Sequence, residues 1–358
     1  MPLVDVPGIL DTADIAATVD SIAQLQLPSG MIPWFPGGHA DPWNHVEAAM
    51  ALLIGDRRAE AERAFDWLVA MQRPDGAWHH YYLADRIEQD KLEANVTAYV
   101  AAGVWHHWLL TRDRGFLETM WSVVEPAIDF VLDLQQPRGE IIWARHPDGT
   151  PWTFALLTGS SSICHSLRCA VAIAEELGHE RPDWELSLAR LADVVRRRPD
   201  GAFAPKNRWA MDWYYPVLCG AITGDMARAH LDAKRDVFLM PEHGVRCVSD
   251  RPWITAAETC ECAMAYLTVG DDATARELFE CAQQMRLDDG RYWTGTVYPE
   301  NVHFPENETS SYTAAAVVLA ADALAGTNAG STLFTTFESL PPILPVDDIV
   351  SEDAVIDD

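Results

Sequence analysis

The chain of 358 residues has little positive charge and very little lysine. It contains 26 Lys and Arg residues against 54 Asp and Glu residues, a formal net charge of -28, and its lysines are Lys91, Lys206 and Lys234 alone. A surface of this sign repels nucleic acids and anionic membranes. We therefore expect neither as a partner, and we attribute most of the acidity to solubility.

Long apolar runs and nucleotide motifs are also missing. No uncharged apolar stretch of about 18 residues occurs, so the sequence predicts no transmembrane helix. The N-terminal segment lacks the basic region and apolar run of a secretory signal, and we expect a cytoplasmic protein. Neither a G-x-G-x-x-G motif nor a P-loop occurs, so we expect no nucleotide cofactor.

The cysteines do not form the pattern of a disulfide framework or a zinc site. There are seven, an odd number, and Cys260 and Cys262 form a C-x-C without a second pair. This favours reduced thiols in helices. His39, Asp41 and His45 lie close in sequence, but their spacing is loose for a metal site, and we expect no metal.

One sequence pattern recurs six times along the chain. It consists of the end of an amphipathic helix, a glycine turn and usually an aromatic residue. The turn glycines are separated by 46, 63, 62, 43 and 46 residues. The turns at Gly76 and Gly201 read Pro-Asp-Gly, in which proline presets φ and glycine adopts a positive φ. Such a repeat predicts a stack or ring of similar units. The glycines are Gly30, Gly76, Gly139, Gly201, Gly244 and Gly290.

Each turn lies between two predicted helices of different character. The helix before the turn is amphipathic, at 11–26, 57–72, 115–135, 184–197, 227–240 and 273–286. The helix after it is apolar almost all round, which indicates burial, at 45–54, 94–110, 160–177, 214–222, 256–269 and 310–324.

Six such pairs predict an all-α (α/α)6 toroid, with an outer and an inner ring, as one domain over residues 1–329. An open solenoid is the alternative, but it would expose apolar ends. Residues 330–358 are rich in proline and acidic residues and predict an extended tail that packs against the ring.

Residues 63–78, with the sequence RAFDWLVAMQRPDGAW, resemble the Q-W repeat of squalene and terpene cyclases. The layout of six hairpins also resembles that of prenyltransferases and (α/α)6 glycoside hydrolases. The acid motif D-x-D-D of cyclases is absent from the hairpin ends, and no zinc-ligand trio of a prenyltransferase is found. Cyclisation and prenyl transfer are therefore disfavoured, although a cyclase-like or prenyltransferase-like enzyme remains an alternative.

The hairpin ends are instead rich in carboxylates, Trp, Tyr, His and Asn, which suit a sugar cleft. The segment DPWNHVEAAMAL at residues 41–52 resembles a group of actinobacterial toroid proteins that includes a mycobacterial methylmannose-polysaccharide hydrolase. The resemblance implies endo cleavage of an α-1,4-linked, partly methylated mannoside. It also implies an inverting mechanism.

Hairpins 1 and 5 share the core Glu-X-Ala-Met-Ala-(Leu/Tyr)-Leu, which contains Glu47 in one and Glu261 in the other. Both glutamates sit among apolar residues on inner helices, where an unpaired carboxylate is costly. Two carboxylates that face one cavity are the requirement of glycoside hydrolysis. We therefore predict Glu47 and Glu261 as the catalytic pair, with their roles unassigned. The alternative is that duplication alone repeats them and that they bind backbone or arginine.

Further polar and aromatic residues near the hairpin ends are candidates for binding an oligo- or polysaccharide. Asp41 also fits a helix N-cap before Pro42. We expect a monomer or a homodimer. A non-catalytic carbohydrate- or lipid-binding toroid is the rival from another functional class. The candidate binding residues are Asp41, Trp43, His45, Trp78, Asn95, Trp209, Asp212, Tyr214, Trp253, Glu258, Glu308 and Tyr312.

Overall fold

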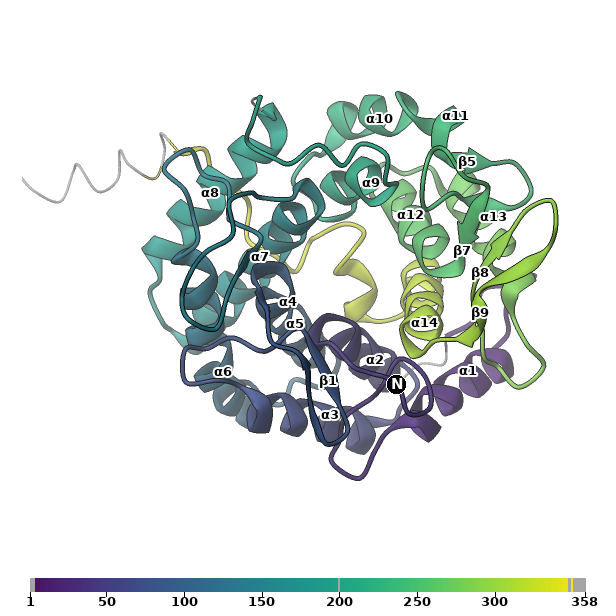
Figure 1. The fold of residues 1–358 in the computed structure, drawn as a ribbon, viewed down its shortest axis with the longest axis horizontal. Helices are drawn as coiled ribbons and strands as arrows, with labels where there is room; N and C mark the ends of the chain where they lie inside the picture. The colour runs from purple at the N-terminus through teal and green to yellow at the C-terminus, as the bar shows by residue number, and fades with distance from the viewer. Residues whose placement is uncertain (1–3, 199, 347–348, 350–358) are drawn as a thin grey trace, which may run out of the picture.

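The helices alternate between an outer and an inner ring around one central axis (Figure 1). The structure is a computed structural model, which describes residues 4–198, 200–346 and 349. The inner ring consists of α2 (Pro42–Ile54), α4 (Ala94–Ala98) with α5 (Val100–Thr111), α7 (Leu157–Leu177), α9 (Met211–Leu218), α12 (Ala256–Thr268) and α14 (Ser311–Ala325). The outer ring consists of α1 (Thr12–Leu25), α3 (Arg58–Met71), α6 (Arg114–Leu132), α8 (Pro182–Arg197), α10 (Gly224–Asp232) with α11 (Arg235–Phe238), and α13 (Asp272–Ala282).

The ring is closed, because its last hairpin packs against its first. The inner helix α14 contacts α2, and the outer helix α1 also contacts α14. The turn at Gly290 lies so close to Ala17 of α1 that a Cβ would come within 2.4 Å of its backbone. The predicted (α/α)6 toroid is confirmed, and the open solenoid is wrong.

Repeated glutamines fasten neighbouring outer helices to one another. The side-chain amide of Gln26 donates to the carbonyl of Glu60 on α3 at 2.8 Å. That of Gln72 donates to Val123 on α6 at 2.8 Å. Gln135, which precedes its turn glycine by four residues as Gln26 and Gln72 do, donates to the carbonyl of Ser187 on α8 at 2.9 Å. The Q-W repeat is therefore a structural device of this ring.

The turn glycines are required both by their φ and by close packing. Gly30 has φ 93° and Gly76 has φ 87°. A Cβ on either would lie 2.1 Å from a carbonyl oxygen of the next outer helix. Any other residue would push the two hairpins apart.

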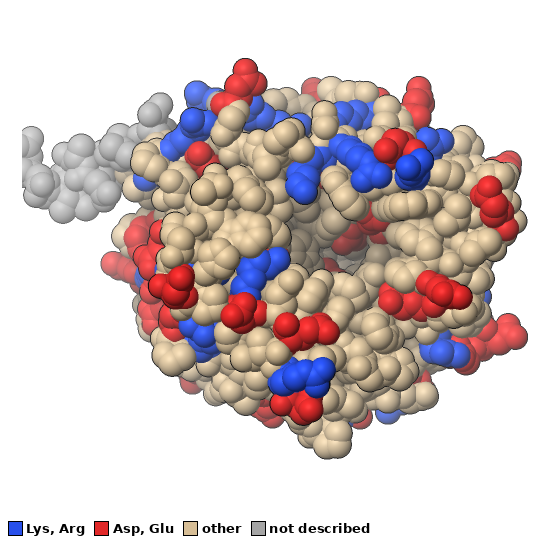
Figure 2. All heavy atoms as spheres, in the orientation of Figure 1, with Lys and Arg blue, Asp and Glu red and all other residues tan. Residues whose placement is uncertain are grey.

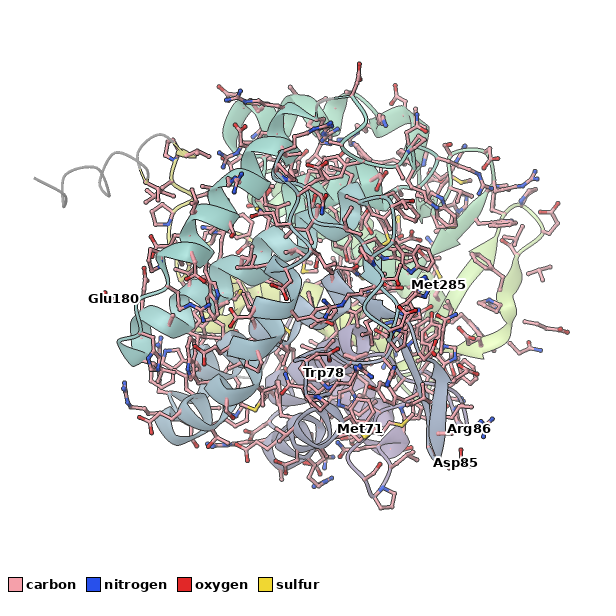
Figure 3. All side chains as sticks on the ribbon, turned by 60° about the vertical axis from the view of Figure 1, so that its left-hand side comes forward. Met71, Trp78, Asp85, Arg86, Glu180 and Met285 are labelled. Atoms are coloured by element: carbon pink, nitrogen blue, oxygen red, sulfur yellow. The ribbon has the colours of Figure 1, made fainter. Side chains whose placement is uncertain are left out.

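Short strands lie along the rim of the ring. The helical periodicity of the sequence does not predict them. The hairpin of β1 (Tyr81–Leu83) and β2 (Arg86–Gln89) projects outward, with Asp85 and Arg86 at its tip (Figure 3). The largest sheet joins β7 (Trp253–Thr255), β8 (Trp293–Val297) and β9 (Val302–Thr309) in antiparallel order. Two further antiparallel pairs consist of strands of two residues each. They are β3 (Leu92–Glu93) with β4 (Ala144–Arg145), and β5 (Leu239–Met240) with β6 (Gly244–Val245).

The segment that follows α14 lies across the centre of the ring (yellow in Figure 1). After the 3-10 turn η2 (Ala329–Thr332), Phe334 and Phe337 are buried against the inner helices. The His165 Nε2 and the Leu333 carbonyl oxygen are 3.0 Å apart, and the Arg168 Nε donates to the carbonyl of residue 341 at 3.0 Å. The described part of the predicted tail thus packs on the ring. Residues 347–348 and 350–358 of that prediction lie outside the described residues.

All seven cysteines are free and buried. In the part of the chain that the structure describes, no helix combines the length and the apolar character of a membrane span.

Candidate active site

A cavity of about 430 Å³ opens at the N-terminal ends of the inner helices. Figure 2 shows it as the hollow at the centre of the ring, with acidic side chains visible inside. Five carboxylates line it in a wall that is otherwise aromatic and polar: Asp41, Glu47, Glu93, Glu258 and Glu261. The helix N-termini carry partial positive charge, which favours acidic groups in the first turns.

Helical spacing arranges the lining residues by depth. On α12, Glu258 lines the cavity, Glu261 lies one turn deeper, and Met264 one turn deeper again. Below the cavity lies a smaller and more enclosed chamber of about 20 Å³. Glu47, Tyr215 and Glu261 line both spaces and so form the boundary between them.

Glu47 is the sixth residue of α2 and is only 7% exposed. The indole N–H of Trp43 donates to its Oε1 at 2.8 Å, and the hydroxyl of Tyr99 donates to the same oxygen at 3.2 Å. Among the described residues, no group donates to Oε2. Burial raises the pKa of Glu47, and the nearby charge of Glu261 raises it further.

Glu261 is the sixth residue of α12 and faces Glu47 across the deep end of the cavity. Both of its oxygens are occupied: Tyr214 donates to Oε2, and Tyr215 donates to Oε1 at 2.7 Å. Burial raises the pKa of Glu261, while the two tyrosine hydroxyls stabilise its ionised form and lower it. Of the pair, Glu261 is therefore the better carboxylate and Glu47 the better acid.

Two further carboxyls lie nearer the mouth. Burial raises the pKa of Glu258 to about 8, and Thr255 donates to its Oε2. Asp41 is the N-cap of α2, because its Oδ1 accepts from the Asn44 N–H at 3.0 Å. Its Oδ2 accepts from Trp34 and from the Asn44 side chain, at 2.8 and 2.7 Å. Asp41 is thus both a cap and part of the cavity wall.

Glu93 belongs to a polar cluster in the cavity wall that includes Lys91 and His80. The Lys91 ammonium lies 2.6 Å from Glu93 Oε1, and the Trp143 indole donates to Oε2 at 3.1 Å. The same ammonium lies 4.2 Å from the centroid of the Trp143 ring. Burial and the charge of Lys91 lower the pKa of His80 to about 3, so this imidazole is neutral.

Aromatic rings form much of the remaining wall. Trp43 stacks on Tyr99 with centroids 4.9 Å apart. Trp34 contacts Tyr312 edge-on at 4.8 Å and Tyr81 at 5.7 Å. Flat apolar rings beside carboxylates are the combination that holds a sugar by its face and its hydroxyls.

Of the predicted site residues, seven line the cavity: Asp41, Trp43, Glu47, Asn95, Glu258, Glu261 and Tyr312. Tyr214 stands behind the wall, fully buried, and reaches the site only through Glu261. The structure does not bring the other six predicted residues to the cavity.

Three of those six are held by structural bonds inside the protein. The His45 ring bridges backbone groups, 2.9 Å from the Ala64 carbonyl oxygen and 3.1 Å from the Ile32 N–H. The Trp78 indole donates to the carbonyl of residue 68 at 2.9 Å, and Figure 3 shows its interior position. Asp212 accepts from the hydroxyl of Thr158 at 2.6 Å.

The remaining three do not line the cavity. Trp209 and Trp253 are 40% and 36% exposed, and Glu308 accepts a hydrogen bond from Thr294 on the neighbouring strand. Trp43 lies four residues before Glu47, whereas Trp253 lies eight residues before Glu261. Trp43 is therefore on the same helix as its glutamate, and Trp253 begins the short strand β7.

Sequence reasoning missed several cavity residues, among them His80, Tyr81, Glu93 and Tyr215. Three of these come from the strands and loops between α3 and α4, which carry no repeat signal. Tyr215 directly follows the predicted Tyr214, and this pair of tyrosines on a predicted inner helix was the available signal.

His39, Asp41 and His45 point to different partners. His39 lies 2.9 Å from Glu88, and His45 is bonded to backbone, so the two rings do not converge with Asp41. Across residues 4–198, 200–346 and 349, no group of three metal-ligating side chains is found.

Comparison with known proteins is consistent with this geometry. No protein-family model matches the chain. It is 49% identical over 329 residues to an MMP endo-(1,4)-3-O-methyl-alpha-D-mannosidase from Mycolicibacterium hassiacum, a match that covers 92% of this chain and 91% of that one.

Two solved structures show the same fold at low identity. A wild-type glycosidase has a TM-score of 0.68 at 14% identity and covers 90% of this chain and 98% of its own. A GH63 mannosylglycerate hydrolase from Thermus thermophilus has a TM-score of 0.65 at 12% identity, covering 85% of this chain and 99% of its own.

Proposed function

Because the chain belongs to the family of the MMP endo-(1,4)-3-O-methyl-alpha-D-mannosidase and is a glycoside hydrolase, we propose that it cleaves internal α-1,4 linkages of 3-O-methylated mannosides. The observation that carries the proposal is the pairing of Glu47 and Glu261 at the deep end of one aromatic cavity. Hydrolysis of a glycosidic bond needs two carboxyl groups on either side of the scissile linkage.

We assign Glu47 as the general acid. Its pKa is raised by burial and by Glu261, so it retains its proton near neutral pH. Its Oε2 has no protein donor among the described residues and is free to protonate the departing glycosidic oxygen. Trp43 and Tyr99 hold the other oxygen and fix the orientation of the carboxyl group.

We assign Glu261 as the general base. Two tyrosine hydroxyls stabilise its negative charge and hold both of its oxygens. A carboxylate restrained in this way is suited to accept a proton from water and ill suited to approach the sugar carbon itself. We therefore propose that water attacks and that the anomeric configuration is inverted.

The rest of the cavity suits a neutral, extended substrate. Stacked pairs such as Trp43 with Tyr99 offer apolar faces to sugar rings, and Asn95, Glu258 and the Glu93 cluster offer hydrogen bonds to hydroxyls. All of these groups come from one chain, so one copy holds a complete site. We propose that the enzyme acts in the cytoplasm as a monomer or a homodimer.

Incubation with a 4-linked, 3-O-methylated α-mannoside of defined length tests the proposal. Products of intermediate length should appear first, because an endo enzyme cuts within the chain. Proton NMR during the first minutes should show the β-anomer of the new reducing end. Binding without shorter products would instead identify a non-catalytic carbohydrate-binding protein, and a first-formed α-anomer would contradict inversion.

A further inference from the structure

The small chamber below the catalytic pair differs in character from the cavity above it. Its walls beyond the two glutamates are largely apolar: Leu218 ends α9 and Cys219 caps it, Met264 comes from α12, and Ala316 and Leu319 come from α14. The Cys219 thiol is buried and its pKa is raised, so it is neutral. Apolar walls that touch the reacting carboxyls are an unusual arrangement for a sugar with free hydroxyls.

The chamber is closed from below by the segment that follows α14. Phe334 lines its floor and stacks on His165 with ring centroids 4.7 Å apart. The His165 ring is bonded to the Leu333 carbonyl oxygen and has no hydrogen bond to spare for a ligand on that nitrogen. The floor is therefore fixed, and access to the chamber runs past Glu47 and Glu261.

The volume of about 20 Å³ sets what the chamber can hold. One water-sized group needs roughly 10–15 Å³ by this measure, so a single small group fits and two do not. A hydroxyl placed there would exchange its hydrogen bonds to water for those that Ser162 and the boundary carboxyls offer. A methyl group would lose no hydrogen bond and would bury its surface against the apolar side chains of the walls.

We infer that this chamber receives the O-methyl group of the sugar bound at the scissile position, and so selects methylated over unmethylated mannosides. The inference rests on the proposed function and adds the residues that would recognise the methyl group. Ala316, Leu319 and Phe334 are its main apolar contacts. They act on substrate choice and hold no proton in the reaction.

A bound water is the competing occupant. The hydroxyl oxygen of Ser162 is buried without a hydrogen-bond partner among the described residues, and it faces the chamber. A water there would serve methylated and unmethylated substrates alike. The two occupants therefore differ in whether the chamber affects substrate choice.

A substrate series measures that choice in the wild-type enzyme. Matched 4-linked α-mannosides with a 3-hydroxyl, a 3-O-methyl or a 3-O-ethyl group are compared by kcat/KM. The methylated substrate should be preferred over the hydroxyl form by roughly ten-fold or more, the usual worth of one methyl group in an apolar pocket. The ethyl ether should be a poor substrate, because the chamber holds only one small group.

Two variants then reshape the chamber in opposite directions. Ala316→Val fills it and should reduce the preference for the methylated substrate to near unity, mainly through slower cleavage of that substrate. Leu319→Ala enlarges it and should raise kcat/KM for the ethyl ether, a gain that a misfolded protein cannot produce. Leu324→Ala, the same change farther along α14 and outside the chamber, serves as the control and should leave all three ratios unchanged.

The outcomes separate this inference from the proposed function. Cleavage of all three substrates with equal kcat/KM, or a loss in Ala316→Val that is equal for methylated and unmethylated substrates, would overturn the chamber's role while leaving the hydrolase intact. Equal losses of that kind would identify water as the occupant. Absence of cleavage with every substrate would overturn the proposed function, and the inference with it.

Discussion

Helices α2 and α12 carry the same sequence core, yet they surround their glutamates differently. Glu47 and Glu261 each occupy the sixth position of their helix. Glu47 takes one donor from its own helix, Trp43, and one from the inner-ring segment between α4 and α5, Tyr99. Glu261 takes both donors from α9 and none from its own helix.

The difference shows how a duplicated motif yields two chemical roles. The shared core fixes the depth at which each carboxyl lies, because depth depends on position along the helix. The neighbours determine where the proton resides, because each donor to a carboxylate stabilises its ionised form. Two tyrosines on separate oxygens favour ionisation of Glu261, whereas Glu47 has two donors on one oxygen and a facing negative charge.

Removing either carboxyl gives the largest effect. Glu47→Gln and Glu261→Gln should each lower kcat on the oligosaccharide by about 10³-fold, within the range for loss of a general acid or base. An aryl α-mannoside with a good leaving group needs no acid. On that substrate Glu47→Gln should recover most of its rate, and Glu261→Gln should not.

The leaving-group comparison uses single-turnover rates, with Glu118→Gln, an exposed carboxyl on the outer helix α6, as the control. Recovery of Glu261→Gln in place of Glu47→Gln would reverse the assigned roles. A full loss in Glu258→Gln, with either predicted variant active, would move one role to that residue.

Removal of a tyrosine donor should move one limb of the pH profile at a time. The profile of kcat/KM should be bell-shaped, with activity lost at low pH as Glu261 gains a proton and at high pH as Glu47 loses one. Tyr214→Phe destabilises ionised Glu261 and raises its pKa, so the acidic limb should move upward by about one pH unit. Tyr214 does not line the cavity, which leaves substrate contacts unchanged.

Tyr99→Phe makes the matching change on the other side of the pair. Loss of this donor destabilises ionised Glu47, so the alkaline limb should move to higher pH by up to about one unit. The shift should be smaller than that of Tyr214→Phe, because the Tyr99 bond is long at 3.2 Å. If both variants move the same limb, the two glutamates do not hold separate roles.

Asp322 shows what burial does to a carboxyl that has no catalytic partner. It lies near the end of α14, accepts from Asn328, and has its pKa raised by burial to about 7. Its ionisation therefore costs stability as pH rises from the unfolded pKa toward 7. Asp322→Asn should raise the Tm by a few degrees at pH 8 and by nothing at pH 4. An equal change in Tm at both pH values would contradict this account.

The helices were predictable from sequence because each one has a strong signal of its own. Hydrophobic periodicity separates the amphipathic outer helices from the apolar inner ones, and the glycine turns mark their junctions. The equal depth of Glu47 and Glu261 followed from the shared core. The activity class was also predictable, and the glycoside hydrolase prediction is confirmed.

The strands and their cavity residues were not predictable in the same way. Tyr81 and Glu93 reach the cavity through short strands whose pairing depends on segments distant in sequence, such as β4 against β3. Loop tryptophans were over-predicted for a related reason. Trp78 and Trp209 carry the same local signal as Trp43, and only packing decides that Trp43 alone among them lines the cavity.

The floor of the active site comes from residues that follow all six hairpins in the sequence. Leu333, Phe334 and Phe337 follow α14 in the chain, yet they close the ring beneath Glu47 and Glu261. A chain that ended before Leu333 would keep all six hairpins and both glutamates but would lack Phe334 beneath them. The segment after α14 is thus part of the active site, although it lies outside the six-fold repeat.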